Sequence, residues 1–433
     1  MRMWNEMQMN AGTQNGLLGA TNAMQADIKF QNRIRILELF RNGHPRTVND
    51  IAAITGISRQ TVAKAITHYC ARGLLKSLGK GQSSSVGGKR PEIFRFDSAE
   101  RFLCITMWPS ELNFSIYDVC GACLFYEMNK MDFPASIDES LQIVRKMLEH
   151  FLIMHGIVKT DICAVSLSMS GTVNYKQQLL RYNSQKPEWG ANIPIGDFLH
   201  SVFPHDPMFF IENAGKTTAR SVLYDESLCK KRVLVLFVAW GLCATLIENG
   251  HILNGTDSLI GEVGHMVIDS SDEEQCGCGN HGCFERMVSI ERIHKIMQAQ
   301  TRERAMSSLA SIPIESTTFQ DIFGASDSND AYARTLVDLL AERFAMALQN
   351  ISLVFNQDIV IFQGNFSAAD PYFDERLMAH LTKFRYFPEG RPFETRYDKR
   401  ALSNLVNMGA LYELNRMYFS NPALYFDDTP EDL

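Results

Sequence analysis

Hydrophobic residues recur at helical spacing close to the start of the chain. Ile34, Leu37 and Phe40 fall on one face of a helix that we predict over residues 27–41. The Asn-Gly-His-Pro segment that follows should end this helix, because Gly adopts the left-handed stop conformation and Pro cannot continue a helix.

A short helix and a longer helix are predicted next. Thr47 and Asp50 form a capping-box pattern, and Ile51 and Ile54 should supply the buried face of the short helix. A Thr-Gly-Ile turn follows, and Ser58 should cap the longer helix.

The longer helix has an apolar face and a polar face. Val62, Ile66 and Tyr69 recur at the spacing of a buried stripe. The residues that we expect to contact base edges or phosphates are Ser58, Arg59, Gln60, Thr61 and Lys64. A short helix, a Gly turn and a polar-faced helix are typical of a helix-turn-helix whose last helix enters the DNA major groove.

Two strand-like segments, residues 74–78 and 92–96, flank a Gly/Ser-rich loop after this helix. They predict a wing, whose loop should lie near phosphates or the minor groove. The basic residues of this wing are Lys80, Lys89 and Arg90. Residues 27–97 are therefore predicted to form a winged helix-turn-helix domain.

Apolar strand-like runs alternate with helical segments through the rest of the chain, which predicts an α/β body. The strand-like runs are residues 102–107, 114–119, 123–128, 162–168, 233–239 and 359–362. An amphipathic helix is expected over residues 140–155 and a long helix over residues 330–355. No apolar run approaches the ~18 residues of a transmembrane helix, and residues 1–26 lack the apolar core of a signal peptide. We therefore expect a flexible tail over residues 1–26 and a cytoplasmic location.

Charge is divided unevenly within a chain whose formal net charge is −7. Residues 27–96 hold thirteen Lys or Arg against four Asp or Glu, a balance of +9, whereas residues 97–433 carry −16. A basic module joined to an acidic body indicates that the module meets a polyanion. Together with the helix-turn-helix pattern, it predicts double-stranded DNA as a partner. The alternative is a helical cap that only packs on the body.

Three of the ten cysteines lie within eight residues. Cys276, Cys278 and Cys283 offer three thiolates in a Gly-rich loop, which can fold tightly around an ion. Tetrahedral zinc needs one more ligand; His265 and His281 are both near, and the spacing does not choose between them. Four protein ligands leave no open position, so the predicted zinc site is structural. Free cysteines in a loop are the alternative.

These residues resemble the motif of the ROK family, which comprises repressors, uncharacterised reading frames and sugar kinases. Residues 261–265 read Gly-Glu-Val-Gly-His, and residues 276–285 read Cys-Gly-Cys-Gly-Asn-His-Gly-Cys-Phe-Glu. The resemblance implies that His265 is the fourth zinc ligand. It also implies a body of two actin-like (ribonuclease-H-like) α/β lobes. The N-terminal module, with its Gly-Gly-Lys-Arg-Pro wing, is similar to that of the family's repressor branch.

The motifs that ROK kinases use for phosphoryl transfer are altered here. The first strand turn of the kinases carries an Asp and a Gly-Gly-Thr loop, whereas residues 105–111 read Ile-Thr-Met-Trp-Pro-Ser-Glu. The second loop, residues 240–245, keeps one glycine of three. The catalytic Asn-Asp pair reads Asn213-Ala214, and alanine cannot accept a proton. We therefore predict no catalytic residues and no enzyme activity.

The resemblance implies that Asn213, Glu262, His265 and Glu285 bind a sugar, and carboxylates and amides suit polyols. His265 would bind zinc through one nitrogen and present the other to the sugar. The two carboxylates could instead brace the zinc loop, and Asn213 could cap the helix that follows it. Lys216 could favour an anionic ligand, although a solvated helix lysine is the simpler interpretation.

Lobe 1 is expected over residues 98–212 and lobe 2 over residues 213–404, with the zinc loop at residues 261–285. A C-terminal helix and tail, residues 405–433, should pack back on lobe 1. Our hypothesis is a transcriptional repressor of carbohydrate metabolism genes. It would bind an operator as a homodimer or homotetramer and respond to a sugar or sugar phosphate held between the lobes. The alternatives are a ROK sugar kinase with an appended DNA-binding domain and a ligand-independent regulator.

Overall fold

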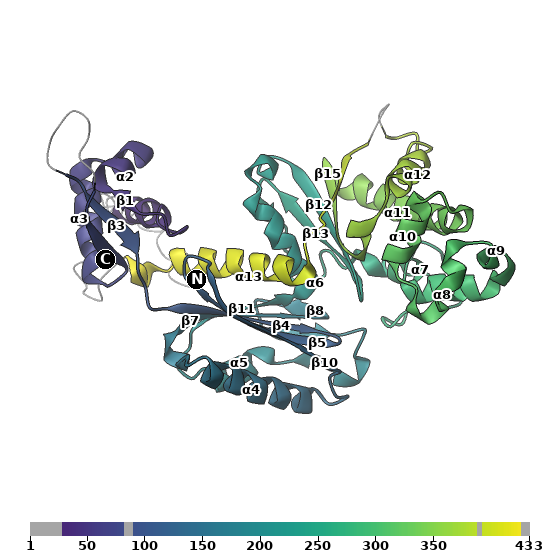
Figure 1. The fold of residues 1–433 in the computed structure, drawn as a ribbon, viewed down its shortest axis with the longest axis horizontal. Helices are drawn as coiled ribbons and strands as arrows, with labels where there is room; N and C mark the ends of the chain where they lie inside the picture. The colour runs from purple at the N-terminus through teal and green to yellow at the C-terminus, as the bar shows by residue number, and fades with distance from the viewer. Residues whose placement is uncertain (1–27, 82–89, 388–391, 426–433) are drawn as a thin grey trace, which may run out of the picture.

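The computed structural model describes residues 28–81, 90–387 and 392–425. The tail predicted over residues 1–26 and the wing residue Lys89 lie outside these residues. A small N-terminal module is followed by two larger lobes, each built on a sheet with helices beside it (Figure 1). The predicted fold class, a helix-turn-helix followed by two α/β lobes, is confirmed.

The N-terminal module holds three helices beside a small sheet in strand order β1-β3-β2. Its elements are a helix over residues 28–38, β1 (Arg46–Thr47), α2 (Val48–Thr55), α3 (Arg59–Ala71), β2 (Leu75–Lys80) and β3 (Glu92–Phe96). The capping box of α2 forms as predicted, and Ser58 accepts a hydrogen bond of 3.2 Å from the Thr61 backbone N–H at the start of α3.

One predicted core residue of this module is wrong. Ile51 is fully buried, but Ile54 is 56% exposed. The buried stripe of α2 instead runs through Ile51 and Thr55, one helical turn apart, which turns Ile54 outward. The Thr55 hydroxyl tolerates burial because it donates to the Ile51 carbonyl oxygen at 2.7 Å.

Lobe 1 is built on a five-stranded sheet in the order β11-β7-β4-β5-β6. The strands are β4 (Arg101–Trp108), β5 (Glu111–Asp118), β6 (Cys123–Lys130), β7 (Ile162–Met169) and β11 (Met208–Asn213). Helices α4 (Ile137–Met154) and α5 (Ile195–Val202) lie along one face, and α13 (Leu402–Phe419) lies along the other (Figure 1). A small sheet of β8 (Thr172–Asn174), β9 (Leu179–Tyr182) and β10 (Ala191–Ile193) extends this lobe.

Lobe 2 repeats the same strand pattern in the order β14-β13-β12-β15-β16. Its strands are β12 (Arg232–Val238), β13 (Leu242–Glu248), β14 (His251–Ile252), β15 (Ile359–Gly364) and β16 (Glu394–Tyr397). In both sheets three antiparallel strands precede two that join in parallel.

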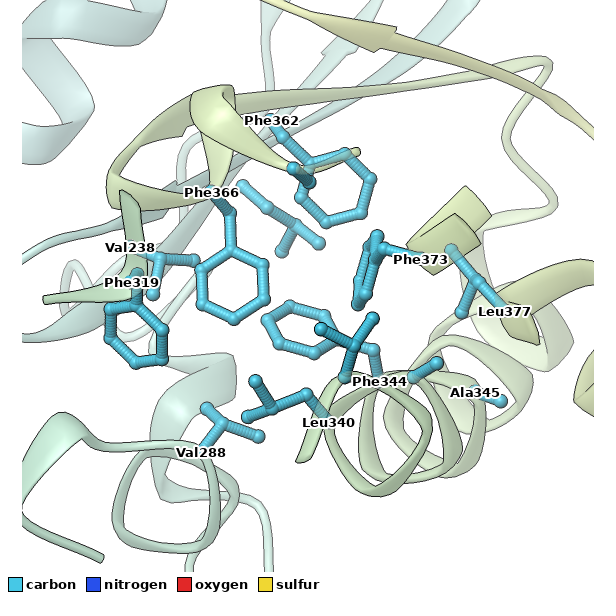
Figure 2. Packing of buried hydrophobic residues seen from close by; sticks show 14 of the residues in the cluster. Val238, Val288, Phe319, Leu340, Phe344, Ala345, Phe362, Phe366, Phe373 and Leu377 are labelled. Carbon is cyan, nitrogen blue, oxygen red and sulfur yellow. The ribbon is translucent and has the colours of Figure 1, made fainter. Parts of the chain in front are cut away.

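The sheet of lobe 2 is covered on both faces. Along β12, Leu234 and Leu236 face a large aromatic core, whereas Val233 and Val235 face the opposite side, as the two-residue period of a strand requires. Figure 2 shows Phe344, Phe362, Phe366 and Phe373 packed together in the aromatic core. The helices on that side include α10 (Phe319–Asp327), α11 (Ala331–Phe355) and α12 (Pro371–Leu381), and α6 (Ala214–Ala219) lies on the other.

The C-terminal helix α13 joins three parts of the molecule. Its middle packs on α6, and Gly409 is required there because a Cβ would lie 1.7 Å from the Thr217 carbonyl oxygen. The segment that follows it reaches the N-terminal module, where the ring of Tyr425 lies 5.5 Å from that of Phe30 and 6.2 Å from that of Tyr69. One continuous apolar core therefore includes residues of the helix-turn-helix, of lobe 1 and of the segment from α13 to Tyr425.

Candidate ligand cleft and metal cluster

A cleft lies where the two lobes meet. It holds about 590 Å³ of empty space, including the part open to solvent. The structure brings together along its wall the four residues that the sequence predicted to bind a sugar, namely Asn213, Glu262, His265 and Glu285. Tyr182, Asn183 and Gln185 add further polar groups from lobe 1.

Asn213 ends β11 and begins α6. Its Oδ1 accepts a hydrogen bond of 3.0 Å from the Lys216 backbone N–H. Asn213 therefore caps α6, which the sequence analysis gave as the alternative role of this residue. Its Nδ2 donates to the Gly171 carbonyl oxygen at 2.7 Å. The Cys243 thiol also donates to Oδ1, at 3.7 Å, so the second N–H of Nδ2 is the group that Asn213 keeps for a ligand in the cleft.

Lys216 is buried, with 8% of its surface exposed, so the interpretation as a solvated helix lysine is wrong. Its Nζ lies 3.1 Å from the Glu262 carboxylate and donates to the Ser258 carbonyl oxygen at 3.0 Å. An ammonium buried this deeply needs such partners to offset lost hydration. Lys216 does not line the cleft; it holds the Glu262 carboxylate that does.

Glu285 stands at the start of α7 (Phe284–Met287). One of its carboxylate oxygens accepts a hydrogen bond of 2.7 Å from the Leu242 backbone N–H. Burial raises the pKa of Glu285, because a charged carboxylate loses hydration there. The carboxylate therefore braces the lobe 2 strand β13 and also lines the cleft.

Three cysteines and one histidine converge beside the cleft. The ligand atoms of His265, Cys276, Cys278 and Cys283 all lie within 4.8 Å of one another, so this cluster could hold a metal ion. Nδ1 of His265 lies 3.6 Å from the Cys276 sulfur. His281 is exposed and stands outside the cluster.

Burial raises the pKa of the Cys276 and Cys283 thiols, and a coordinated cation would have the opposite effect and favour the thiolates. The Gly-Glu-Val-Gly-His segment reaches this position by lying close against β13. A Cβ at Gly261 would fall 1.9 Å from the Ala244 carbonyl oxygen, and one at Gly264 would fall 2.3 Å from that of Leu242. Only glycine allows this approach.

An aromatic stack that sequence reasoning missed stands at one end of the cleft. The rings of Trp108 and Trp240 lie 5.0 Å apart, and those of Trp108 and Phe237 lie 5.7 Å apart, nearly parallel. Trp108 ends β4, and Trp240 lies in the turn between β12 and β13. Both belong to the segments that the sequence analysis compared with the glycine loops of the ROK kinases.

A buried ionic network lies behind the cleft. Arg220 contacts Glu212 at 3.2 Å and Glu413 at 3.7 Å, and it donates to the Lys216 carbonyl oxygen at 3.1 Å. Glu212 comes from β11, Arg220 follows α6, and Glu413 lies on α13. The network therefore ties the residue next to Asn213 to the C-terminal helix. Residues far apart in sequence form it, and no local pattern indicated it.

The predicted DNA-contacting residues of α3 and its cap are exposed on one side of the N-terminal module: they are Ser58, Arg59, Gln60, Thr61 and Lys64. Arg90 is also exposed, at the base of the wing, and Lys89 lies outside the described residues. The opposite side of α3 packs into the core through Val62, Ile66 and Tyr69, as predicted.

The sequence profile of the ROK family matches residues 124–408. The chain belongs to the ROK family. Among curated relatives, the xylose repressor of Bacillus spizizenii is 21% identical over 367 residues, 84% of this chain and 90% of that repressor. The DNA-binding transcriptional repressor Mlc of Escherichia coli is 20% identical and covers 80% of this chain and 84% of Mlc. A glucokinase of Halalkalibacterium halodurans is 30% identical over 244 residues, 56% of this chain and 72% of the kinase.

Solved structures of ROK proteins share this fold. A ROK family transcriptional regulator described as a homologue of Escherichia coli Mlc aligns with a TM-score of 0.72 at 19% identity, over 90% of this chain and 99% of that one. A ROK family glucokinase from Streptomyces griseus, solved with glucose and AMPPNP, aligns with a TM-score of 0.60 at 16% identity, over 73% of this chain and 99% of the kinase. Among the described residues of the present chain, no helix is both long and apolar enough to cross a membrane.

Proposed function

We propose that this ROK protein is a DNA-binding transcriptional repressor of carbohydrate metabolism genes. The observation that carries the proposal is a helix-turn-helix, with an exposed polar helix, joined in one molecule to a cleft lined by three amides and two carboxylates. Its curated relatives include repressors, and this chain aligns with most of the length of each of them. As a DNA-binding regulator it would act in the cytoplasm.

The cleft is the proposed effector site, for a sugar or sugar phosphate. Asn213, Glu262, His265 and Glu285 would bind the hydroxyls, since carboxylates and amides can each hold paired hydroxyls. Binding between two lobes favours one angle between them, and α13 packs on both α6 and the N-terminal module. A shift at the cleft would thus reach the DNA-binding heads of a homodimer or homotetramer and change their spacing.

We further propose that the protein is not a kinase. Ala214 stands where the ROK kinases have their catalytic Asp, and it offers no group that could accept a proton. The nearest upstream carboxylate, Glu212, is bound to Arg220 and does not line the cleft. An assay with ATP, magnesium and a panel of sugars should give no phosphorylated product. Turnover that disappears in an Asn213→Ala variant would favour the alternative of a sugar kinase with an appended domain.

The metal proposed for the cysteine cluster is zinc, in a structural role. Three sulfurs and one imidazole nitrogen at mutual distances within 4.8 Å are the donor set that tetrahedral zinc prefers. His265 would bind it through Nδ1, the ring nitrogen nearest to the Cys276 sulfur, and present Nε2–H to the cleft. With four protein ligands the ion would have no open position for hydrolysis, and it would hold the cleft wall in register.

The central experiment is a selection of bound DNA from random duplexes, carried out with the purified full chain in the presence and absence of pooled sugars and sugar phosphates. We expect an enriched palindrome, because two-fold symmetric dimers contact two half-sites. Release by one sugar would support the repressor. An enriched palindrome that no sugar releases would favour the ligand-independent regulator, and the absence of any enriched sequence would contradict DNA recognition.

Arg59→Ala is expected to weaken specific DNA binding by about 10–100-fold, the loss associated with about 1–3 kcal/mol from one base contact. Arg59 is exposed at the start of α3, so the fold should remain intact. Fluorescence anisotropy with the selected operator measures the change. Arg302→Ala, an exposed arginine of α9 (Thr301–Ala305) in lobe 2, is the matched control. Equal affinities of the two variants would contradict the assignment of α3 as the recognition helix.

A further inference from the structure

A second and larger chamber adjoins the ligand cleft. It encloses about 1050 Å³, against about 590 Å³ for the cleft, each including the part open to solvent. The two share five lining residues, Gln185, Trp240, Gly241, Leu242 and Glu285, so they lie on either side of the same small group of residues. The apolar wall of this outer chamber includes Val238, Val288 and Phe319, which Figure 2 shows at one side of the lobe 2 core.

The charge of both chambers disfavours a phosphate. None of the described residues that line either chamber is a lysine or an arginine, whereas Glu262 and Glu285 line the cleft and Glu285 and Glu291 line the outer chamber. A phosphate would meet carboxylates with no cation to pair with it. The nearby ammonium of Lys216 is already bound to Glu262 and to a backbone carbonyl oxygen.

The outer chamber offers the groups that a neutral sugar ring requires. Trp240 is 43% exposed and lies against Trp108, which leaves part of its indole surface available for a ligand. A flat aromatic surface suits the apolar C–H face of a pyranose. Asn365 and Ser289 on the wall can bond its hydroxyls.

The junction between the chambers is polar. A Cβ at Gly241 would lie 3.1 Å from Oε2 of Glu285 and 3.2 Å from Nε2 of Gln185, so glycine lets these two polar side chains lie close together where the chambers meet. The Oε1 atom of Gln185 is buried and has no hydrogen-bond partner among the described residues. A buried acceptor of this kind costs free energy unless a ligand or water donates to it.

We propose that the effector is a neutral disaccharide that occupies both chambers. One ring binds at Asn213, Glu262, His265 and Glu285, and the second ring stacks on Trp240 in the outer chamber. The inference rests on the proposed sugar-responsive function and narrows its ligand from sugars and sugar phosphates in general to uncharged two-ring sugars.

The test is calorimetric titration of the full chain with matched probes: xylobiose and xylose, cellobiose, maltose and glucose, chitobiose and N-acetylglucosamine, glucose 6-phosphate, and magnesium ATP. We expect at least one disaccharide to bind about tenfold more tightly than its monosaccharide, and both to bind more tightly than the phosphate or ATP. In Trp240→Ala the ratio of the two affinities should fall to near one. Trp240→Phe, which keeps an aromatic face, should restore most of it.

A monosaccharide that binds as tightly as its disaccharide, or tighter binding of glucose 6-phosphate or ATP, would overturn the two-ring proposal and leave the sugar-responsive repressor in place. A disaccharide advantage that Trp240→Ala leaves unchanged, in a protein with wild-type melting temperature, would likewise overturn it. Absence of binding by every probe, with operator binding retained, would overturn both this inference and the sugar response.

Discussion

Replacing Cys278 by serine is expected to weaken metal binding by more than about 100-fold and to lower the melting temperature. Loss of an outer partner that only orients a metal ligand costs roughly 10–100-fold in affinity, and loss of a ligand itself should cost more. Cys278 is exposed, so a loss of stability in this variant cannot come from lost apolar packing. Elemental analysis of the purified protein and thermal unfolding measure the two effects.

Two exposed residues outside the cluster provide controls. His281→Ala removes the other histidine of the loop, and Cys229→Ser removes an exposed thiol elsewhere in lobe 2. Both should keep the metal content and the melting temperature of the wild type, whereas a chelator added to the wild type should reproduce the Cys278→Ser melting curve. A Cys278→Ser protein with full metal content and unchanged melting would contradict a structural metal site.

The same variant should also bind the effector more weakly. His265 belongs both to the metal cluster and to the cleft wall, and Glu285 follows the cluster residue Cys283 by two positions. Without the ion these side chains lose the link that fixes their positions. If the metal is lost and the sugar affinity does not change, the metal does not position the residues of the cleft. Its role would then be only to stabilise the loop.

Features set by neighbouring residues could be predicted from the sequence. The capping box at Thr47, the cap at Ser58 and the buried stripe through Val62, Ile66 and Tyr69 depend on contacts within one helix, and all are present. The two-lobe arrangement depends on contacts between distant segments, and the resemblance to the ROK family supplied that expectation. The strand order within each sheet was not predicted.

Features that distant residues create could not be predicted. From the sequence of its helix alone, Lys216 is predicted to be a surface lysine. Its partners Glu262 and Ser258 are distant in sequence and lie beside it only after lobe 2 folds. Tyr425 completes the core of a module that begins almost four hundred residues earlier, which no spacing rule detects. The spacing of the cysteines also did not decide whether His265 or His281 is the fourth metal ligand. Of these two, the fold brings only His265 into the cluster.

Arg220→Met is expected to lower the free energy of unfolding by about 3–5 kcal/mol, because it leaves a buried carboxylate without its cation. The side chain of Arg220 is 6% exposed and that of its partner Glu212 is 4% exposed, so water cannot replace the lost interaction. Glu413 loses a contact as well but keeps Arg416 nearby. Chemical denaturation followed by circular dichroism gives the free energy of unfolding.

The matched control is Arg232→Met, which breaks a half-exposed pair with Glu248 and a hydrogen bond to the Phe355 carbonyl oxygen and should cost about 1–2 kcal/mol. A double variant, Arg220→Met with Glu212→Leu, should be more stable than Arg220→Met alone, since the stranded charge is then absent. Because Glu212 adjoins Asn213 and Arg220 also contacts α13, the single variant should in addition weaken the release of operator by effector. If Arg220→Met lowers the free energy of unfolding no more than Arg232→Met does, the buried network does not hold α6 to the C-terminal helix. The proposed coupling between the cleft and the DNA-binding module would then lack a rigid connection.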